Sequence, residues 1–360
     1  MPPVKKPAKT KLKPPSKRPK KLPYSGWDLT KHGVSQSLLQ KFIVCRDRFH
    51  IATARALRST DRKEAMEYGS IFHKLIEWGA EMGKSWTMIK MERRLNEYIR
   101  KNQPTDQSIL LARIALAQFR HYQAANSKLP AYKYIAQEPV FAEEYTLPAC
   151  SHSTEAYTMH IPRTKVLLRG RIDEVLEVDG NLWLQENKTK AQINIEVLKD
   201  TIPENLQVMF YATAAGIKYK RPVKGIIYNV IRKPGQRQRK TESDADFVKR
   251  ISGEVESNPS HYFYRIAYSF PRGAVKKWQK EELEPLLYQL YIWWSSIKAN
   301  PLQPWVDDAG NANPFHGRRS FGVYDPMSNG KGEFFDLLIH GSKRGLVVDN
   351  EFFPELQDDD

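Results

Sequence analysis

The chain has 360 residues, 41% of them hydrophobic, which is enough for one large domain or two smaller ones with a true core. Its formal net charge of +16 makes an acidic polymer such as nucleic acid a plausible partner. The two cysteines exclude a disulfide framework and suit a reducing cytoplasm, and no apolar run approaches the roughly 18 residues of a membrane span.

The first 22 residues carry nine Lys or Arg and no acid, interspersed with prolines. This composition offers little to bury, so we expect residues 1–24 to form a disordered basic tail. Such a tail either keeps the protein in solution or adds salt-dependent contacts with phosphates, and the sequence leaves both roles open.

Helices are expected in the N-terminal half. One begins near Ser37, where Ser37 and Gln40 fit a capping box, and a second covers about 64–82. The region 86–126 is also predicted to be helical, with an interruption near Pro104. The first helix turns these side chains inward: Leu38, Leu39, Phe42, Cys45 and Phe49.

An extended run over 132–147 leads into a hairpin centred on Asp179-Gly180, a strong two-residue turn signal. That turn sets the register of the flanking strands and places Asp173 directly opposite Glu186. Facing carboxylates repel, and a divalent cation removes the penalty. Lys188 projects from the same face as Glu186. A one-residue slip would leave an exposed hairpin with ordinary surface charges instead.

Four further side chains can join this group. His73 is either a structural histidine or a metal ligand, and Glu77, one turn later, could orient its ring. Gln207 and Tyr211 share one helix face at i and i+4 spacing, either as a partly buried polar edge or to position Lys188, a water or a nucleic-acid backbone.

The rest of the chain alternates helices and strands, which indicates a mixed α/β fold with helices flanking a sheet. Thr201 to Glu204 are expected to cap a helix that ends near Ala215. Residues 301–360 are predicted to form a loop-rich segment that packs on the core. The remaining elements are strands over 223–233 and 261–270 and helices over 242–256 and 272–299.

Five motifs, in order, resemble the PD-(D/E)XK nuclease superfamily and are most similar to its RecB-like branch. These motifs are S-x-x-x-x-F-x-x-C over 37–45, G-x-x-x-H over 69–73, G-x-x-D over 170–173, E-x-K-T over 186–189 and Q-x-x-x-Y over 207–211. The resemblance implies a restriction-endonuclease-like core sheet over residues 25–300, with a helical insertion at 82–130 above the active site.

The resemblance also implies the chemistry of a metal-dependent DNase using Mg²⁺ or Mn²⁺. Lys188 would be the catalytic lysine. Gln207 and Tyr211 would contact the site and the DNA strand, and Arg171 and Lys190 would bind substrate beside them. The implied metal ligands are His73, Asp173, Glu186 and the backbone carbonyl of Asn187.

By the same resemblance, the substrate is single-stranded or end-containing DNA and the reaction is exonucleolytic, within recombination or replication in the cytoplasm of a bacterium or a phage-infected cell. A structure-specific endonuclease and a non-catalytic DNA-binding protein are the alternatives. An RNA-binding module lacks its aromatic motif, and no G-x-S-x-G elbow, P-loop or H-E-x-x-H suggests another hydrolase.

One departure concerns the cysteines. Many relatives bind an iron–sulfur cluster through one cysteine of the opening helix and three near the C-terminus. Cys45 stands at the first position, but the segment ANPFHGRRSFGVYDP contains none of the others, so no cluster is expected. We expect packing to hold the C-terminal segment instead, through Trp305, Phe315, Phe321 and Tyr324.

Overall fold

The computed structural model describes residues 26–59, 64–101, 105–126, 132–153, 158–298, 304–305, 312–313, 316, 324–325, 330–348 and 353. The basic tail predicted for 1–24 lies outside these residues. Within them, no helix is both long and apolar enough to cross a bilayer.

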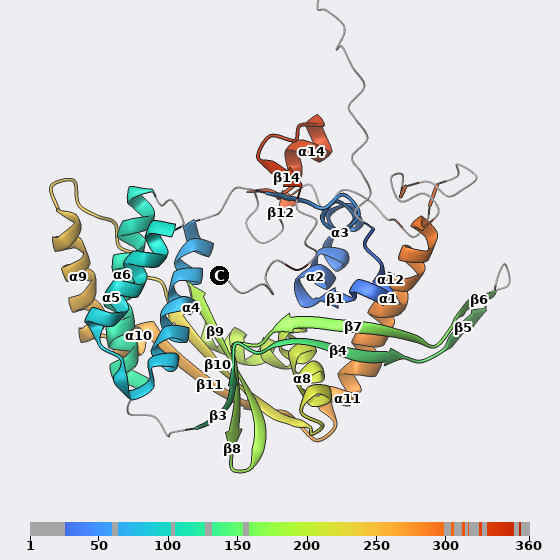
Figure 1. The fold of residues 1–360 in the computed structure, drawn as a ribbon, viewed down its shortest axis with the longest axis horizontal. Coiled ribbons are helices and arrows are strands. Elements are labelled where there is room, and N and C mark those ends of the chain that lie inside the picture. The colour runs from blue at the N-terminus through green and yellow to red at the C-terminus, as the bar shows by residue number, and fades with distance from the viewer. Residues whose placement is uncertain are drawn as a thin grey trace, which may run out of the picture.

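Two sheets form the centre of the molecule (Figure 1), and the mixed α/β architecture is confirmed as restriction-endonuclease-like. The larger sheet has the strand order β11-β10-β9-β8-β3, in which only β9 and β10 run parallel. Its strands are β3 (Lys133–Gln137), β8 (Glu174–Val178), β9 (Asn181–Lys190), β10 (Val223–Arg232) and β11 (Phe263–Ser269). The smaller sheet, in the order β1-β7-β4, contains β1 (Val34–Ser35), β4 (Val140–Leu147) and β7 (Thr164–Arg171).

The chain crosses from one sheet to the other at a shared bend. The strand pair β4–β7 ends where the pair β3–β8 begins, and the bend contains Glu138 on one strand and Asp173 on the other. The backbone N–H of Glu138 donates to the carbonyl of Asp173 at 2.8 Å, and Glu138 has a φ of 47°. This φ is unusual for a residue with a side chain and marks local strain at the junction.

The hairpin register is confirmed. Asp179 and Gly180 have φ values of 49° and 72°, as a two-residue hairpin turn requires. Val178 pairs with Asn181, and the ladder continues to Glu174 opposite Gln185. Asp173 and Glu186 are the next residues along this ladder on either strand.

The opening helices pack against the smaller sheet and contribute Leu39, Phe42 and Phe49 to the main core. The cap of the second helix is Ser35, whose hydroxyl accepts from Leu38 N, so the predicted cap at Ser37 is wrong by two residues. The predicted helix divides in two at Cys45. These elements are α1 (Leu29–His32), α2 (Gln36–Val44) and α3 (Arg46–Thr53).

A group of helices covers one face of the larger sheet, at the left of Figure 1. Its core is a separate aromatic cluster that includes Phe72, Phe119, Tyr122 and Phe247. The helix predicted at 64–82 has these bounds, and the region 86–126 forms two helices. The group consists of α4 (Glu64–Met82), α5 (Met88–Lys101), α6 (Asp106–Asn126), α9 (Asp244–Ser257) and α10 (Pro259–Tyr262).

The remaining helices pack on the main core. Thr201 to Glu204 do not cap the central helix: Asn205 does, through its side-chain oxygen on Gln207 N and Val208 N. The long C-terminal helix contains a π-helical turn at Gln279–Leu283, which ends two residues before Pro285, a residue without a backbone donor. These helices are α7 (Ile195–Thr201), α8 (Leu206–Lys218), α11 (Ala274–Trp278) and α12 (Glu284–Ile297).

The C-terminal region is held by polar contacts as well as by packing. His316 donates from Nε2 to Asp47 Oδ1 at 2.7 Å, while its Nδ1 accepts from the indole N–H of Trp293 at 3.2 Å. Phe334, 1% exposed, packs on Ile51 of α3. The expectation for Trp305 is wrong, because its side chain is 43% exposed.

The side chains of Phe315, Phe321 and Tyr324 lie outside the described residues. The segment is less loop-like than predicted, because β14 pairs antiparallel with β2 near the N-terminus. Short elements complete the fold: β2 (Leu57–Ser59), β5 (Cys150–Ser153), β6 (Thr158–Ile161), β12 (Tyr324–Asp325), β13 (Gly330–Lys331), α14 (Phe335–His340) and β14 (Leu346–Val348).

Candidate active site

Three potential metal ligands converge where the two sheets meet. His73 comes from α4, and Glu138 and Asp173 come from the bend between the sheets. One ligand atom of each lies within 4.8 Å of the other two, and His73 Nδ1 is 3.8 Å from Asp173 Oδ2. An imidazole nitrogen and two carboxylates at this separation form a donor set suited to a divalent cation.

The next layer of the site is built by β9 and α8. Glu186 is fully buried, and its Oε2 contacts Lys188 Nζ at 3.0 Å and accepts from Gln207 Nε2 at 3.1 Å. Its other oxygen, Oε1, is buried and has no hydrogen-bond partner among the described residues. A buried carboxylate oxygen without a partner is costly, and a cation would relieve that cost.

The pKa values in the site also indicate that its acids outnumber the positive charges near them. Burial, followed by the Asp173 carboxylate, raises the pKa of Glu186 and of Glu138 well above the ordinary carboxyl range. Burial alone would lower the pKa of Lys188, but Glu186 and Asp173 raise it above its usual value, so the ammonium stays charged. One lysine therefore faces three acids, and a divalent ion would offset this excess of negative charge.

Two glycines allow the elements to approach closely enough to build the site. A Cβ on Gly69 would lie 2.8 Å from Thr189 Oγ1, so glycine at this position lets α4 pack closely against β9. A Cβ on Gly170 would lie 2.4 Å from Phe141 Cζ and 3.0 Å from a ring carbon of Tyr211. These contacts account for the glycines of the G-x-x-x-H and G-x-x-D motifs.

The family model for the PD-(D/E)XK nuclease superfamily matches residues 33–288, which contain every residue of this site. The chain belongs to this nuclease superfamily. A search of curated proteins found no match. Among solved structures, the crystal structure of SSO0001 is similar at 12% identity over 62% of this chain and 84% of that chain, with a TM-score of 0.19.

In this nuclease, hydrogen bonds of Asn187 and Asn229 hold the strands that carry the acids in place. Asn187 N donates to Asp173 Oδ2 at 2.6 Å, which places the Asn187 backbone in the site. The Asn187 side chain points the other way and accepts from Asn229 Nδ2 at 2.9 Å. Asn229 also contacts the Tyr122 hydroxyl, so helix α6 is tied to the strand that presents Glu186 and Lys188.

The nuclease site contains most of the residues predicted from the sequence. Asp173, Glu186, Lys188, His73 and Gln207 are joined by the contacts above. Tyr211 lies beside them on the same helix face as Gln207, 9% exposed, and burial followed by the charge of Glu186 raises its pKa.

Three other predicted residues sit at its edge. Glu77 does not orient His73: its carboxylate is 3.1 Å from Lys74 Nζ, and among the described residues no hydrogen bond joins it to the histidine. Arg171 lies close enough to Glu138 to lower the pKa of that carboxyl against the larger effects of burial and neighbouring acids. Lys190 is exposed at the end of β9.

Glu138 was not predicted. It follows a strand-like run and precedes Pro139, and this Glu-Pro pair within an extended segment is the only local signal of a bend. Its proximity to Asp173 depends on pairing between β3–β4 and β7–β8, which local patterns do not reveal.

Proposed function

We propose that this nuclease is a divalent-metal-dependent DNase of the RecB-like branch that degrades single-stranded or end-containing DNA. The observation that carries the proposal is the buried Glu186, whose Oε1 has no hydrogen-bond partner among the described residues and whose carboxyl group interacts electrostatically with Asp173, Glu138 and Lys188. Such a group of buried acids costs folding free energy unless protons or a cation compensate its charge, and a divalent ion would supply that compensation. The RecB-like assignment and the exonuclease preference rest on the motif resemblance.

Asp173, Glu186 and His73, together with the Asn187 carbonyl, would hold Mg²⁺ or Mn²⁺, and Glu138 would be a further ligand. When bound, the metal would acidify a water and polarise a phosphate oxygen. A nitrogen ligand among hard oxygens would favour tolerance of Mn²⁺.

The side chains of the chain itself have three tasks. The Lys188 ammonium, kept charged by Glu186, would hold the attacking water or balance the charge that grows on the phosphate. Gln207 would fix the rotamer of Glu186 through its 3.1 Å hydrogen bond. Arg171, Lys190 and Tyr211, at the rim of the same site, would hold the DNA backbone.

The test compares linear and covalently closed circular DNA, each single- and double-stranded, with labelled ends and with Mg²⁺, Mn²⁺ or EDTA. We expect metal-dependent loss of linear single strands from their ends and protection of circles. Cleavage of circles at a similar rate would make the enzyme an endonuclease. The Lys188→Ala variant is the matched negative control and should leave the substrates nearly intact. If the wild-type protein also leaves every substrate intact with both metals, the nuclease proposal is wrong.

A further inference from the structure

A basic loop, residues 233–240, leaves the larger sheet directly beside the candidate active site. Strands β9 and β10 run parallel, with Val230 level with Lys188 and Arg232 level with Lys190. The loop begins where Lys233 N donates to the carbonyl of Lys190 at 2.8 Å. Lys190 lies two residues beyond Lys188, or about 7 Å along the strand. Single-strand binding sites usually span about 4–16 nucleotides, so a strand cleaved at Lys188 would reach this loop.

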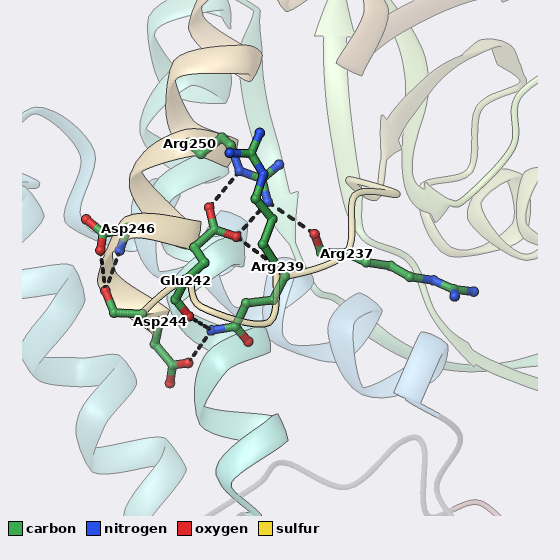
Figure 2. Close-up of polar contacts among 8 residues, drawn as sticks. Arg237, Arg239, Glu242, Asp244, Asp246 and Arg250 are labelled. Atoms are coloured by element: carbon green, nitrogen blue, oxygen red, sulfur yellow. Dashed lines mark hydrogen bonds and ion pairs between the residues drawn. The ribbon is translucent and has the colours of Figure 1, made fainter.

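The loop is strongly cationic and accessible. Its sequence, KPGQRQRK, contains four Lys or Arg and no acid. Arg237, Arg239 and Lys240 are exposed, and across the described part of the chain none of them forms an ion pair. Figure 2 shows the Arg237 side chain directed away from the neighbouring acids. The loop therefore presents three exposed cations that are not held in direct ion pairs by the described carboxylates.

Although it is neither helix nor strand, the loop is held in one shape by a carboxylate at its base (Figure 2). Glu242 accepts from Arg250 Nε at 2.7 Å and Nη2 at 2.8 Å, and also from the backbone N–H of Arg239 at 3.0 Å. Arg250 donates in turn to the Arg237 carbonyl at 3.1 Å. The hydrogen bonds from Arg250, followed by that from Arg239 N, lower the pKa of Glu242 to about 2.

The other nearby acids also accept hydrogen bonds. Gln238 Nε2 donates to Asp244 Oδ1 at 2.8 Å and to the Glu242 carbonyl at 3.0 Å. Glu254 contacts the Gln236 amide and the Tyr262 hydroxyl. The acids of this region thus support the backbone of the loop through neutral amides and through Arg250, and among the described residues none of them forms a direct ion pair with Arg237, Arg239 or Lys240.

A groove of about 710 Å³ opens between this loop and helices α4, α6 and α9. Its wall is largely apolar on the helical side, and Asp106 and Asp244 lie on its lining. Carboxylates repel phosphate, so the groove suits the bases of a strand whose phosphates contact the exposed cations of the loop. The apolar and loop residues that line it include Leu110, Leu111, Phe247, Pro234, Gly235 and Arg237.

We propose that the 233–240 loop is a preformed binding site for the DNA strand next to the scissile phosphate. Arg237, Arg239 and Lys240 contact its backbone, and the adjoining groove takes its unpaired bases. The proposal rests on the proposed nuclease function, because it assigns the loop to the substrate of that same site. It specifies a single strand, since the bases of a duplex are not available to the groove.

The test measures binding of a fluorescent single-stranded oligonucleotide in EDTA, where no cleavage occurs, across a range of salt concentrations. The variant Arg237→Ala/Arg239→Ala/Lys240→Ala should weaken binding at least about tenfold at low salt and flatten the log–log salt slope by about 2, or roughly 0.7 per lost phosphate contact. The matched control is Lys276→Ala/Lys277→Ala/Lys280→Ala, which removes the same charge from exposed lysines on and next to α11. That control should bind nearly as the wild type does. Equal loss in both variants, or no loss in the first, would overturn the proposal.

A second variant separates the shape of the loop from its charge. Glu242→Gln makes the protein more positive, so attraction through net charge alone would strengthen binding. If the carboxylate holds the loop in its binding shape, the same change weakens binding. Unchanged or tighter binding by a variant with wild-type melting temperature would refute a preformed site.

The strand preference is tested by the same oligonucleotide as a blunt duplex, which should bind more weakly and lose less in the triple variant. A larger loss for the duplex would overturn the single-strand assignment. Cleavage in Mn²⁺ keeps the two proposals apart. If wild-type protein cuts DNA but the loop variants bind normally, only the loop proposal fails; if wild-type protein neither binds nor cuts DNA, the nuclease proposal fails.

Discussion

Replacing Asp173 by asparagine should make the metal-free protein more stable while removing its response to metal. Asp173 and Glu138 have ligand atoms within 4.8 Å of each other, and unit charges at that distance in an effective dielectric of 20 repel by about 3.5 kcal/mol. Part of this repulsion is already relieved, because the raised pKa of Glu138 favours its neutral form. The asparagine carbonyl can still accept from Asn187 N. We therefore expect a gain of about 1–2 kcal/mol in the free energy of unfolding.

The assay is thermal unfolding at about pH 8 in EDTA and in excess Mn²⁺. At a concentration about 100 times the dissociation constant, a bound ion adds about 2.7 kcal/mol to wild-type stability. For a chain of this size, each kcal/mol corresponds to a shift in Tm of about 2–4 °C. The Asp173→Asn variant should start higher in EDTA and show almost no shift with Mn²⁺.

The matched control is Glu174→Gln at the adjacent position. Glu174 is 3% exposed, but its side chain pairs with the Gln185 amide on the opposite face of the strand. Its neutralisation should leave the metal-induced rise in Tm intact. If Asp173→Asn keeps a wild-type rise, or if Glu174→Gln loses it equally, the proposed ligand assignment is incorrect.

Three other outcomes follow from the same geometry. Lys188→Ala should lower the cleavage rate by about 10²–10³-fold or more while leaving oligonucleotide affinity in EDTA nearly unchanged, and a rate near wild type would remove this lysine from the mechanism. Because the pKa values of Glu186 and Glu138 are raised from 4.5 in the folded state, the metal-free Tm should fall as pH rises from about 5 to about 8. Excess Mn²⁺ should flatten this dependence of Tm on pH. A Tm that does not change with pH in EDTA would contradict the proposed repulsion between the acids. Gly170→Ala should cost about 1–3 kcal/mol through overlap with the Phe141 ring, whereas Gly253→Ala on open helix surface should stabilise by a fraction of that, as denaturant unfolding can show.

The parts of the site predicted from sequence are those set by local chemistry. The turn at Asp179-Gly180 determines the pairing of its two strands, and strand alternation then determines which side chains share a face. This is sufficient to place Asp173, Glu186 and Lys188 together. Helix spacing likewise placed Gln207 and Tyr211 on one face of α8.

The parts that were missed depend on contacts between distant segments. The strand that carries Asp173 belongs to two sheets, and only its pairing with β3 and β4 brings Glu138 to the same bend. The interaction of His316 with Asp47 joins residues separated by 269 positions. The failed assignment of Glu77 has a different cause, because its contact is local: its carboxylate pairs with Lys74 three residues earlier on α4, and helix spacing alone does not choose between that lysine and the histidine ring.

The contact of His316 with Asp47 also joins the C-terminal segment of the chain to its opening helices. Where iron-containing relatives join the opening helix to the C-terminal segment through sulfur, this chain uses an imidazole stacked on Trp293 and hydrogen-bonded to a carboxylate two residues beyond Cys45. Both residues of this contact are buried, at 4% exposure for His316 and 6% for Asp47, so its loss would deprive a buried carboxylate of one hydrogen bond. Replacing His316 should therefore destabilise the packing of the C-terminal segment against the opening helices.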